Sequence, residues 1–183
     1  MAEAGKRYST ISILLHWLIA VLVLVQILLI SAHDATEGPL SREFVQIHKS
    51  VGLSVLLLTL FRIGWRLANP PPALPATMKP WEKALSGTVH VLFYVALIVL
   101  PLTGWAASSA TGREIVWFGL FNWPLLPIGG GRETAGALMD LHGIAVKTVY
   151  VLVALHVIGA LKHQFIDRDT VPGRMIPWLA RRP

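Results

Sequence analysis

Seven histidines in 183 residues are the side chains of this sequence best suited to chemistry. Five of them, His16, His48, His90, His142 and His156, fall inside or at the edge of long apolar segments. Ionisable side chains inside a membrane are rare and usually mark a functional site. Neutral imidazole is also a common metal ligand. A single histidine of this kind just as often only makes a hydrogen bond between packed helices. The spacing of the five histidines is therefore more informative about function than any one of them.

Four apolar segments carry these histidines. A bilayer core of about 30 Å needs roughly 20 apolar helical residues, and the segments at about 11–30, 47–66, 82–107 and 139–166 meet that length. Charged residues make up 14% of the chain, well below the roughly 25% of a soluble domain. We therefore predict an all-α integral membrane bundle of four transmembrane helices, with residues 1–183 as one domain.

Basic residues predict the orientation of this bundle. Positive charge gathers in cytoplasmic loops, so both termini are predicted to be cytoplasmic. The same pattern explains the net charge of +6, and nucleic-acid binding is excluded because the basic residues lie between apolar segments rather than on one face. Eleven of the sixteen basic residues fall on the side of the termini: Lys6, Arg7, Arg62, Arg66, Lys79, Lys83, Lys162, Arg168, Arg174, Arg181 and Arg182.

The first apolar segment has one alternative interpretation. Lys6 and Arg7 precede it, and Ile-Ser-Ala precedes His33, as in a cleaved signal peptide. Its apolar stretch is longer than the usual length of about 7–15 residues, and it contains His16 and Gln26. We therefore expect this segment to be retained as a transmembrane helix.

The depths of the histidines predict how they pair. His142 and His156 are 14 residues apart, which places them within about 40° on one helix face and roughly 21 Å apart along its axis. His16 and His156 lie at similar depths from the cytoplasm, and His48 and His142 both lie at the outer side. His16 can therefore meet His156, and His48 can meet His142. His90 shares the depth of His16 and is a rival partner for His156.

A haem suits such a pair, because its apolar ring needs a cleft between helices and one axial imidazole from each wall. The chain has no cysteine, which excludes thiolate-bound iron–sulfur clusters and covalently attached c-type haem. Glycines next to the histidines, namely Gly52, Gly143 and Gly159, are candidates for contact with the ring. The alternative is that these glycines only allow close helix packing.

Other polar residues have candidate roles around these pairs. Arg62 and Arg66 are candidates for haem propionates, because a guanidinium fork suits carboxylates, with lipid headgroup contact as the alternative. If His90 is not a ligand, it can face a quinone headgroup with His163 and Lys79, as hydrogen-bond donor or proton carrier. A simple hydrogen bond between helices is the alternative for His90.

The order of these residues resembles the bacterial cytochrome b561 family. The likeness covers essentially the whole chain, and it extends more distantly to the di-haem cytochrome b subunits of nickel–iron hydrogenases and formate dehydrogenases. No single motif is specific, but the spacing across four helices is. The matching features are His16-Trp17, His48-Lys-Ser-Val-Gly52, Arg62 to Arg66 leading into Asn-Pro-Pro-Pro, and Leu141-His142 with a second histidine 14 residues on.

The resemblance implies two non-covalent haems b, one held by His16 with His156 and the other by His48 with His142. It leaves His90 outside the ligand set. It implies electron exchange with ubiquinone in the bacterial inner membrane and, in the best-known branch, superoxide:ubiquinone oxidoreductase activity. A haem with both axial positions filled by imidazole passes single electrons and has no open site for oxygen chemistry.

Two other functions are weighed against this one. The first is a cytochrome b anchor subunit that relays electrons between a dehydrogenase or hydrogenase partner and quinone. The second is a membrane protein without haem, such as a histidine-lined metal transporter. If superoxide is the donor, positive potential near the outer haem would attract it; the outer basic residues are Lys49, Arg42, Arg113 and Arg132. Lys147 has no assigned role, since it lies roughly 140° from the face of His142.

Overall fold

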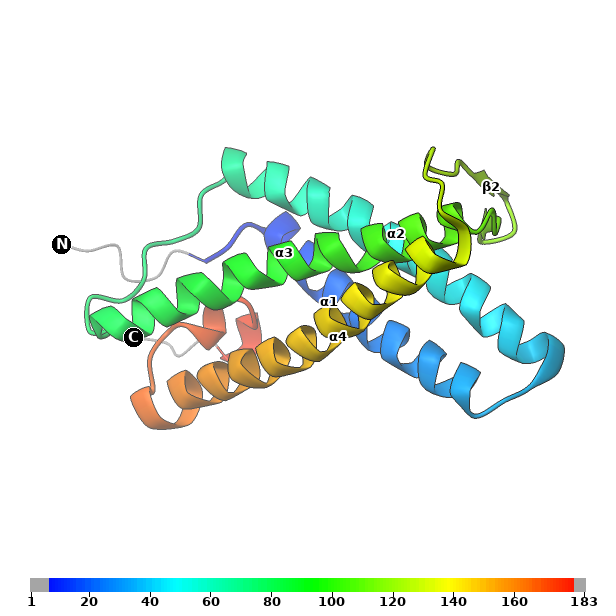
Figure 1. Ribbon diagram of the computed structural model, residues 1–183. Coiled ribbons are helices and arrows are strands. Elements are labelled where there is room, and N and C mark those ends of the chain that lie inside the picture. The colour runs from blue at the N-terminus through cyan, green and yellow to red at the C-terminus, as the bar shows by residue number, and fades with distance from the viewer. Residues whose placement is uncertain (1–6, 180–183) are drawn as a thin grey trace.

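The computed structural model describes residues 7–179 and contains four long helices (Figure 1). Each is long and apolar enough to cross a membrane, so the predicted all-α transmembrane bundle is confirmed. Lys6, Arg181 and Arg182, which contribute to the predicted orientation, lie outside the described residues. The helices are α1 (Thr10–Asp34), α2 (Gly38–Ala68), α3 (Pro80–Ala110) and α4 (Gly131–Lys162).

The first two helices form a hairpin that is tighter than the sequence pattern predicts. α1 begins after Ser9, whose hydroxyl accepts a hydrogen bond from the backbone N–H of Ser12 at 3.2 Å, as an N-cap does. It continues to Asp34, and α2 begins at Gly38, so residues 31–34 and 38–46 are helical although they lie outside the apolar segments. Hydropathy detects the part of a helix that spans the bilayer, and polar residues can extend the helix beyond it.

The outer loop is a small β-hairpin rather than an irregular connection. β1 (Ile115–Trp117) pairs antiparallel with β2 (Phe121–Trp123). The hydroxyl of Ser50 on α2 donates to the carbonyl of Val116 at 3.2 Å and accepts from the N–H of Phe118 at 3.1 Å. Ile115 is almost fully buried. These contacts fasten the hairpin to the outer half of α2, close to His48.

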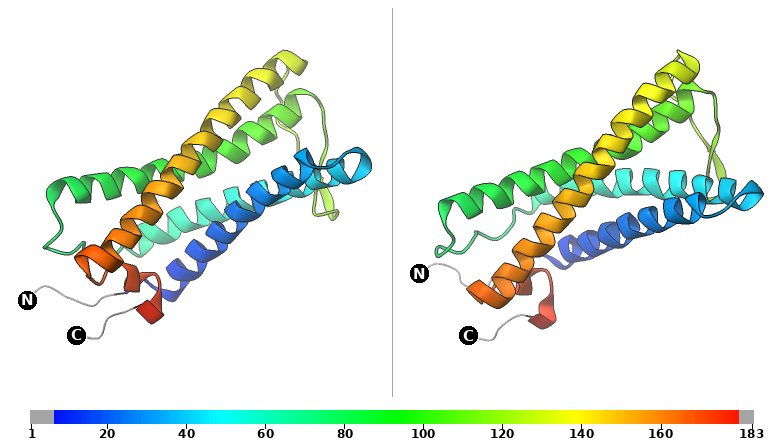
Figure 2. Two further views of the ribbon diagram at one scale, coloured as in Figure 1. Left: turned by 90° about the horizontal axis from the view of Figure 1, so that it is seen from below. Right: turned by 60° about the horizontal axis from the view of Figure 1, so that its bottom comes forward.

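The helices associate as two pairs, α1 with α2 and α3 with α4, and α2 joins the pairs by packing against α3. Figure 2 shows the pairs as two layers that diverge toward the loop between α1 and α2. In the part of the chain that the structure describes, α1 and α4 do not form a close-packed pair. The buried side chains form one cluster in each layer: Val89, Ala96, Val149 and Leu152 between α3 and α4, and Ile19, Val51 and Val55 between α1 and α2.

The cytoplasmic end, so named from the predicted orientation, is closed by the C-terminal segment. α4 continues into a π-helical turn, η1 (His163–Asp167), and the chain then forms two short 3-10 turns, η2 (Pro172–Arg174) and η3 (Pro177–Leu179). Figure 2 shows this segment crossing from the end of α4 to the beginning of α1. A π-helical turn interrupts the regular hydrogen bonding of a helix and is frequent at functional sites.

Candidate functional site

Histidines from three helices meet at the cytoplasmic end of the bundle. The ring centroids of His16 on α1 and His156 on α4 are 6.1 Å apart, with an interplanar angle of 63°. His90 on α3 lies closer to His156, at 5.5 Å and 84°. Phe93 on α3 also contacts the His156 ring, at 5.7 Å. The structure thus brings the predicted pair together and places its rival beside it.

A second pair lies at the outer end. The ring centroids of His48 on α2 and His142 on α4 are 6.4 Å apart, with an interplanar angle of 66°. Nδ1 of His142 lies 2.9 Å from the carbonyl oxygen of Leu100 and 3.1 Å from the Thr103 hydroxyl. An N–H that donates to a backbone carbonyl holds the ring in one orientation and leaves Nε2 available to a metal.

The ring spacing in both pairs suits a metal ion held between two imidazoles. Imidazole nitrogen binds first-row metals at about 2 Å. Two such bonds, together with the distance from nitrogen to centroid in each ring, separate the two ring centroids by roughly 6 Å. The centroid distances of 6.1 and 6.4 Å agree with that value. Neither pair includes a carboxylate among its ring contacts, and a neutral pair of nitrogen donors is what a haem iron accepts. The imidazoles of each pair are therefore spaced as the axial ligands of a haem iron would be.

Three residues behind His142 were not anticipated from the sequence. Leu100 and Thr103 contact its Nδ1, and a Cβ at Gly104 would lie 3.7 Å from its Cε1. All three belong to α3, which packs against α4. Gly104 could have been noticed as a glycine inside a predicted helix, whereas the carbonyl of Leu100 has no sequence signal because every residue offers a backbone carbonyl.

The predicted glycines occupy two kinds of environment. A Cβ at Gly52 would lie 2.9 Å from Nε2 of Gln26, so this glycine permits close approach of α1 to α2. At Gly143 and Gly159, no described protein atom lies within 4 Å of the position a Cβ would take. The side chain of Gln26 is thus a neighbour of the outer site that sequence reasoning did not identify.

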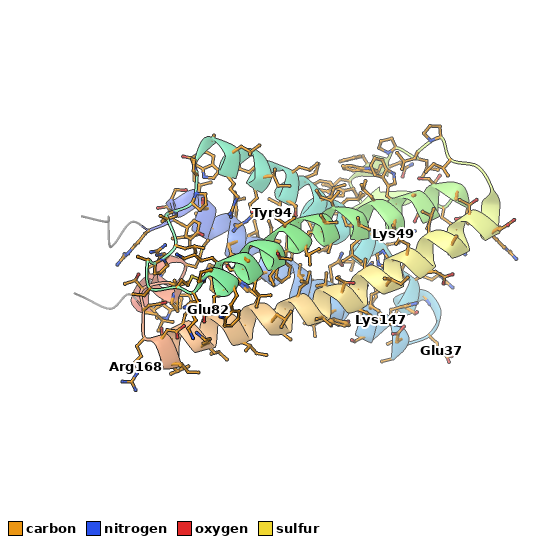
Figure 3. All side chains as sticks on the ribbon, turned by 60° about the vertical axis from the view of Figure 1, so that its left-hand side comes forward. Glu37, Lys49, Glu82, Tyr94, Lys147 and Arg168 are labelled. Atoms are coloured by element: carbon orange, nitrogen blue, oxygen red, sulfur yellow. The ribbon has the colours of Figure 1, made fainter. Side chains whose placement is uncertain are left out.

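Arg62 and Arg66 lie together near the cytoplasmic histidines. A terminal nitrogen of Arg62 donates to the carbonyl of Ser12 at 2.8 Å. The guanidinium carbon of Arg66 lies 6.0 Å from the centroid of the Tyr94 ring, and Figure 3 labels Tyr94 on α3. Both arginines line a small cleft together with Tyr8. The two guanidinium groups give the cleft a positive charge, as a site for a carboxylate requires.

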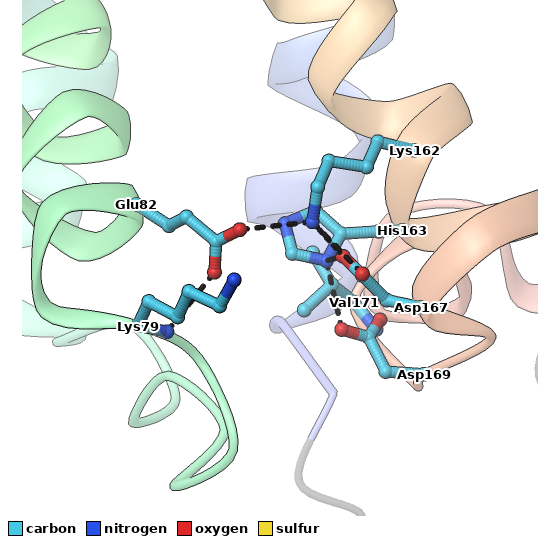
Figure 4. A network of polar contacts seen from close by, with 7 residues as sticks. All are labelled: Lys79, Glu82, Lys162, His163, Asp167, Asp169 and Val171. Atoms are coloured by element: carbon cyan, nitrogen blue, oxygen red, sulfur yellow. Dashed lines mark hydrogen bonds and ion pairs between the residues drawn. The ribbon is translucent and has the colours of Figure 1, made fainter.

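A network of charged side chains joins the beginning of α3 to the end of α4 (Figure 4). The backbone N–H of Lys79 donates to the carboxylate of Glu82 at 3.0 Å, and the other oxygen of Glu82 lies 2.9 Å from Nζ of Lys162. Lys162 also pairs with Asp167 at 2.6 Å. These contacts fix the relative position of the two helices at their cytoplasmic ends.

His163 belongs to the same network. Its Nδ1 lies 2.8 Å from Asp169 and 3.1 Å from Asp167, so the ring is held by carboxylates on one side. Of the three predicted quinone residues, Lys79 and His163 therefore lie at one network, whereas His90 lies deeper, against His156. The structure brings two of the three together and separates the third.

The remaining basic residues of interest lie toward the outer end. Lys49 is half-buried and lies within electrostatic range of Arg113, which follows α3. Lys147 is exposed on α4 (Figure 3). Lys49 and Arg113 therefore form a positive region beside His48, and Lys147 is separate from the ring contact of His142.

Residues 7–178 match the family model described as prokaryotic cytochrome b561. The chain is similar to "Cytochrome b561 homolog 2" of Escherichia coli strain K12, with 31% identity covering 93% of this chain and 92% of that protein. It is also similar to "Probable superoxide oxidase CybB" of Yersinia pestis, with 28% identity covering 94% and 97%. A third relative, "Cytochrome b562" of Cereibacter sphaeroides, is 30% identical over 92% and 94%.

Proposed function

Since the chain belongs to the prokaryotic cytochrome b561 family of membrane cytochromes, we propose that it is a superoxide:ubiquinone oxidoreductase with two haems b. The observation that carries the proposal is the presence of two histidine pairs at opposite ends of the bundle, with ring centroids 6.1 and 6.4 Å apart. When bound, the two haems supply one-electron carriers at the two ends of the membrane span.

We assign His16 with His156 to the cytoplasmic haem and His48 with His142 to the outer haem. The rival pair of His90 and His156 has a closer spacing of 5.5 Å, but its helices are packed directly against each other through a buried apolar cluster. A macrocycle cannot lie between two close-packed helices. α1 and α4 are not packed in this way in the described chain, so the pair that they provide can hold a ring.

The surrounding residues position and shield these groups. The Leu100 carbonyl holds the ring of His142 through Nδ1, which leaves Nε2 as the nitrogen that would bind the haem iron. Arg62 and Arg66 are assigned to the propionates at the cytoplasmic end, where their guanidinium groups share one cleft. Gly52 and Gly159 stay assigned to the edges of the rings, with Gly52 against Gln26.

Ubiquinone is assigned to the cytoplasmic network. Two superoxide anions provide two electrons, which reduce one ubiquinone to ubiquinol with two protons and leave two molecules of oxygen. A group that moves protons is therefore needed beside the quinone. His163 suits this role because Asp167 and Asp169 hold its Nδ1, and Lys79 lies at the same network. His90 is assigned to the inner edge of this site, beside His156.

Superoxide is assigned to the outer end for an electrostatic reason. Lys49 and Arg113 lie near each other beside His48, and positive potential raises the encounter rate of an anion. A relative that carries the name "Probable superoxide oxidase CybB" supports the same substrate. With residues 1–183 as one domain in the bacterial inner membrane and both termini cytoplasmic, this end would face the periplasm.

The test is a direct assay of the purified protein. Superoxide is generated enzymatically in detergent solution with a soluble ubiquinone, and ubiquinol and oxygen are both measured. We expect ubiquinol formation in a ratio of one per two superoxide consumed, and no reaction with haem-free protein. If superoxide reduces neither haem, and the protein instead purifies with a stoichiometric dehydrogenase or hydrogenase, the anchor-subunit function replaces this one.

Gly104 allows the outer ligand to be tested without removing it. A Cβ at this position makes ordinary contact with His142, whereas the two additional methyl groups of valine would press on the ring. We expect Gly104→Val to lower haem content from about two to about one per chain, because overpacking displaces the ligand. A pyridine haemochrome assay measures this.

Gly104→Ala is the matched control and should keep both haems, because its single methyl group fits at contact distance. A Gly104→Val protein with undiminished haem content would show that the His142 ring does not need its present position.

A further inference from the structure

Arg174 is a buried cation that lacks a negative partner among the described residues. Its side chain belongs to η2, and the residue is only 8% exposed. The four ion pairs between residues 7 and 179 do not involve it. Its Nε is buried without a hydrogen-bond partner. Burial of a charge is costly unless the charge is paired and hydrogen-bonded, so this position calls for an anion.

The orientation of the guanidinium group indicates the kind of anion. One terminal nitrogen, Nη1, donates to the carbonyl of Ala73 at 2.6 Å. That contact leaves the edge formed by Nε and Nη2, which is one of the edges through which arginine binds a carboxylate with two parallel hydrogen bonds. The free edge is thus matched to a carboxylate or phosphate rather than to a single carbonyl oxygen.

The position of η2 indicates where that anion comes from. The next residue, Met175, accepts a hydrogen bond from Nε1 of Trp17 at 3.1 Å. Trp17 adjoins His16 in the sequence, and their rings are in contact with centroids 5.3 Å apart. Ala73 belongs to the linker between α2 and α3. Arg174 is therefore held between this linker and the beginning of α1, at the end of the bundle where His16 meets His156.

We propose that Arg174 binds a propionate of the cytoplasmic haem, an assignment that rests on the proposed function. The propionates are the only ionisable substituents of the haem ring, and in a membrane they must lie toward the polar surface. The C-terminal segment crosses from α4 to α1 at that surface, so it covers the two helices that carry the ligands. Arg62 and Arg66 share one cleft and keep their assignment to one propionate, and the uncommitted Nε edge of Arg174 is assigned to the second propionate of the same haem.

The assignment predicts an effect on the reduction potential of one haem. A propionate neutralised by Arg174 repels the incoming electron less than a free propionate does. Removal of the guanidinium charge should therefore make the cytoplasmic haem harder to reduce and leave the outer haem unchanged.

The test is a potentiometric titration of the holoprotein with and without Arg174→Gln. A His48→Ala background removes the outer haem, so the remaining signal comes from the cytoplasmic one. We expect Arg174→Gln to weaken reduction about tenfold, which is a downward shift of about 59 mV for a one-electron couple. Arg174→Lys keeps the charge and should shift the potential less. Arg168→Gln is the matched control, because Arg168 projects from the same segment away from the bundle (Figure 3).

The outcomes separate this inference from the proposed function. An unchanged potential in Arg174→Gln, with haem content intact, would overturn the propionate assignment alone. If the glutamine variant instead loses a bound anionic phospholipid in native mass spectrometry while the potential is constant, the anion is a headgroup phosphate and the assignment is wrong. If Arg174→Gln does not accumulate, Arg174→Met removes the same charge, and a wild-type potential in that variant overturns the assignment. A wild-type protein without haem would refute the proposed function itself.

Discussion

Replacement of His16 or His156 by alanine is expected to lower the haem content from about two per chain to about one, because a bis-imidazole haem loses half of its axial ligation. The two variants should lose the same haem, since their rings face each other at 6.1 Å. The pyridine haemochrome assay gives the stoichiometry, and reduced-minus-oxidised spectra show which absorption band disappears.

His90→Ala is the decisive control for this pair. Its ring lies even closer to His156, at 5.5 Å, but its Nδ1 is 2.7 Å from the carbonyl of Ser86 and its helix is packed against α4. We expect this variant to keep both haems. If His90→Ala lost a haem and His16→Ala kept both haems, His90 rather than His16 would be the axial ligand opposite His156.

Replacement of His48 or His142 by alanine is expected to remove the outer haem and to slow superoxide-driven reduction of ubiquinone more than about 100-fold. Changing only a residue that supports a metal ligand already costs up to about 100-fold, so loss of the ligand itself should cost more. The reason is that the proposed outer haem would lie at the end of the bundle where Lys49 and Arg113 form a positive region. The assay of ubiquinol formation measures the rate, and haem content is determined on the same sample.

His33→Ala is the matched control for the outer pair. His33 lies near the same end of α1, where its Nδ1 is 2.6 Å from the Ser41 hydroxyl, and its role is to fasten the loop between α1 and α2. This variant should keep both haems and the wild-type rate. An undiminished superoxide reaction in His48→Ala would place the entry of electrons at the other end of the protein.

Several contacts of the paired histidines depend on which helices lie side by side, and the sequence pattern does not specify those neighbours. The carbonyl of Leu100 orients His142 only because α3 lies against α4. The contact of His90 with His156 has the same origin. In a membrane, the side of a helix that faces lipid is as apolar as the side that faces another helix, so hydropathy does not reveal which helices are neighbours.

Properties that depend on segment length, membrane depth and helical period could be predicted from the sequence. A bilayer of fixed thickness selects four spanning segments, and a rise of about 1.5 Å per residue sets the depth of each histidine. The prediction that His16 can meet His156, and that His48 can meet His142, followed from those depths, and the structure places both pairs in ring contact.

Properties that depend on contacts between segments far apart in the chain could be seen only in the folded protein. The extent of α1 and α2 beyond the apolar segments, the attachment of the outer hairpin to Ser50 and the network of Lys162 with Glu82 all require neighbours that hydropathy does not specify. Arg174 is the clearest case. From the sequence, Arg174 is predicted only as one of the basic residues at the cytoplasmic end. It is buried because η2 folds against the beginning of α1.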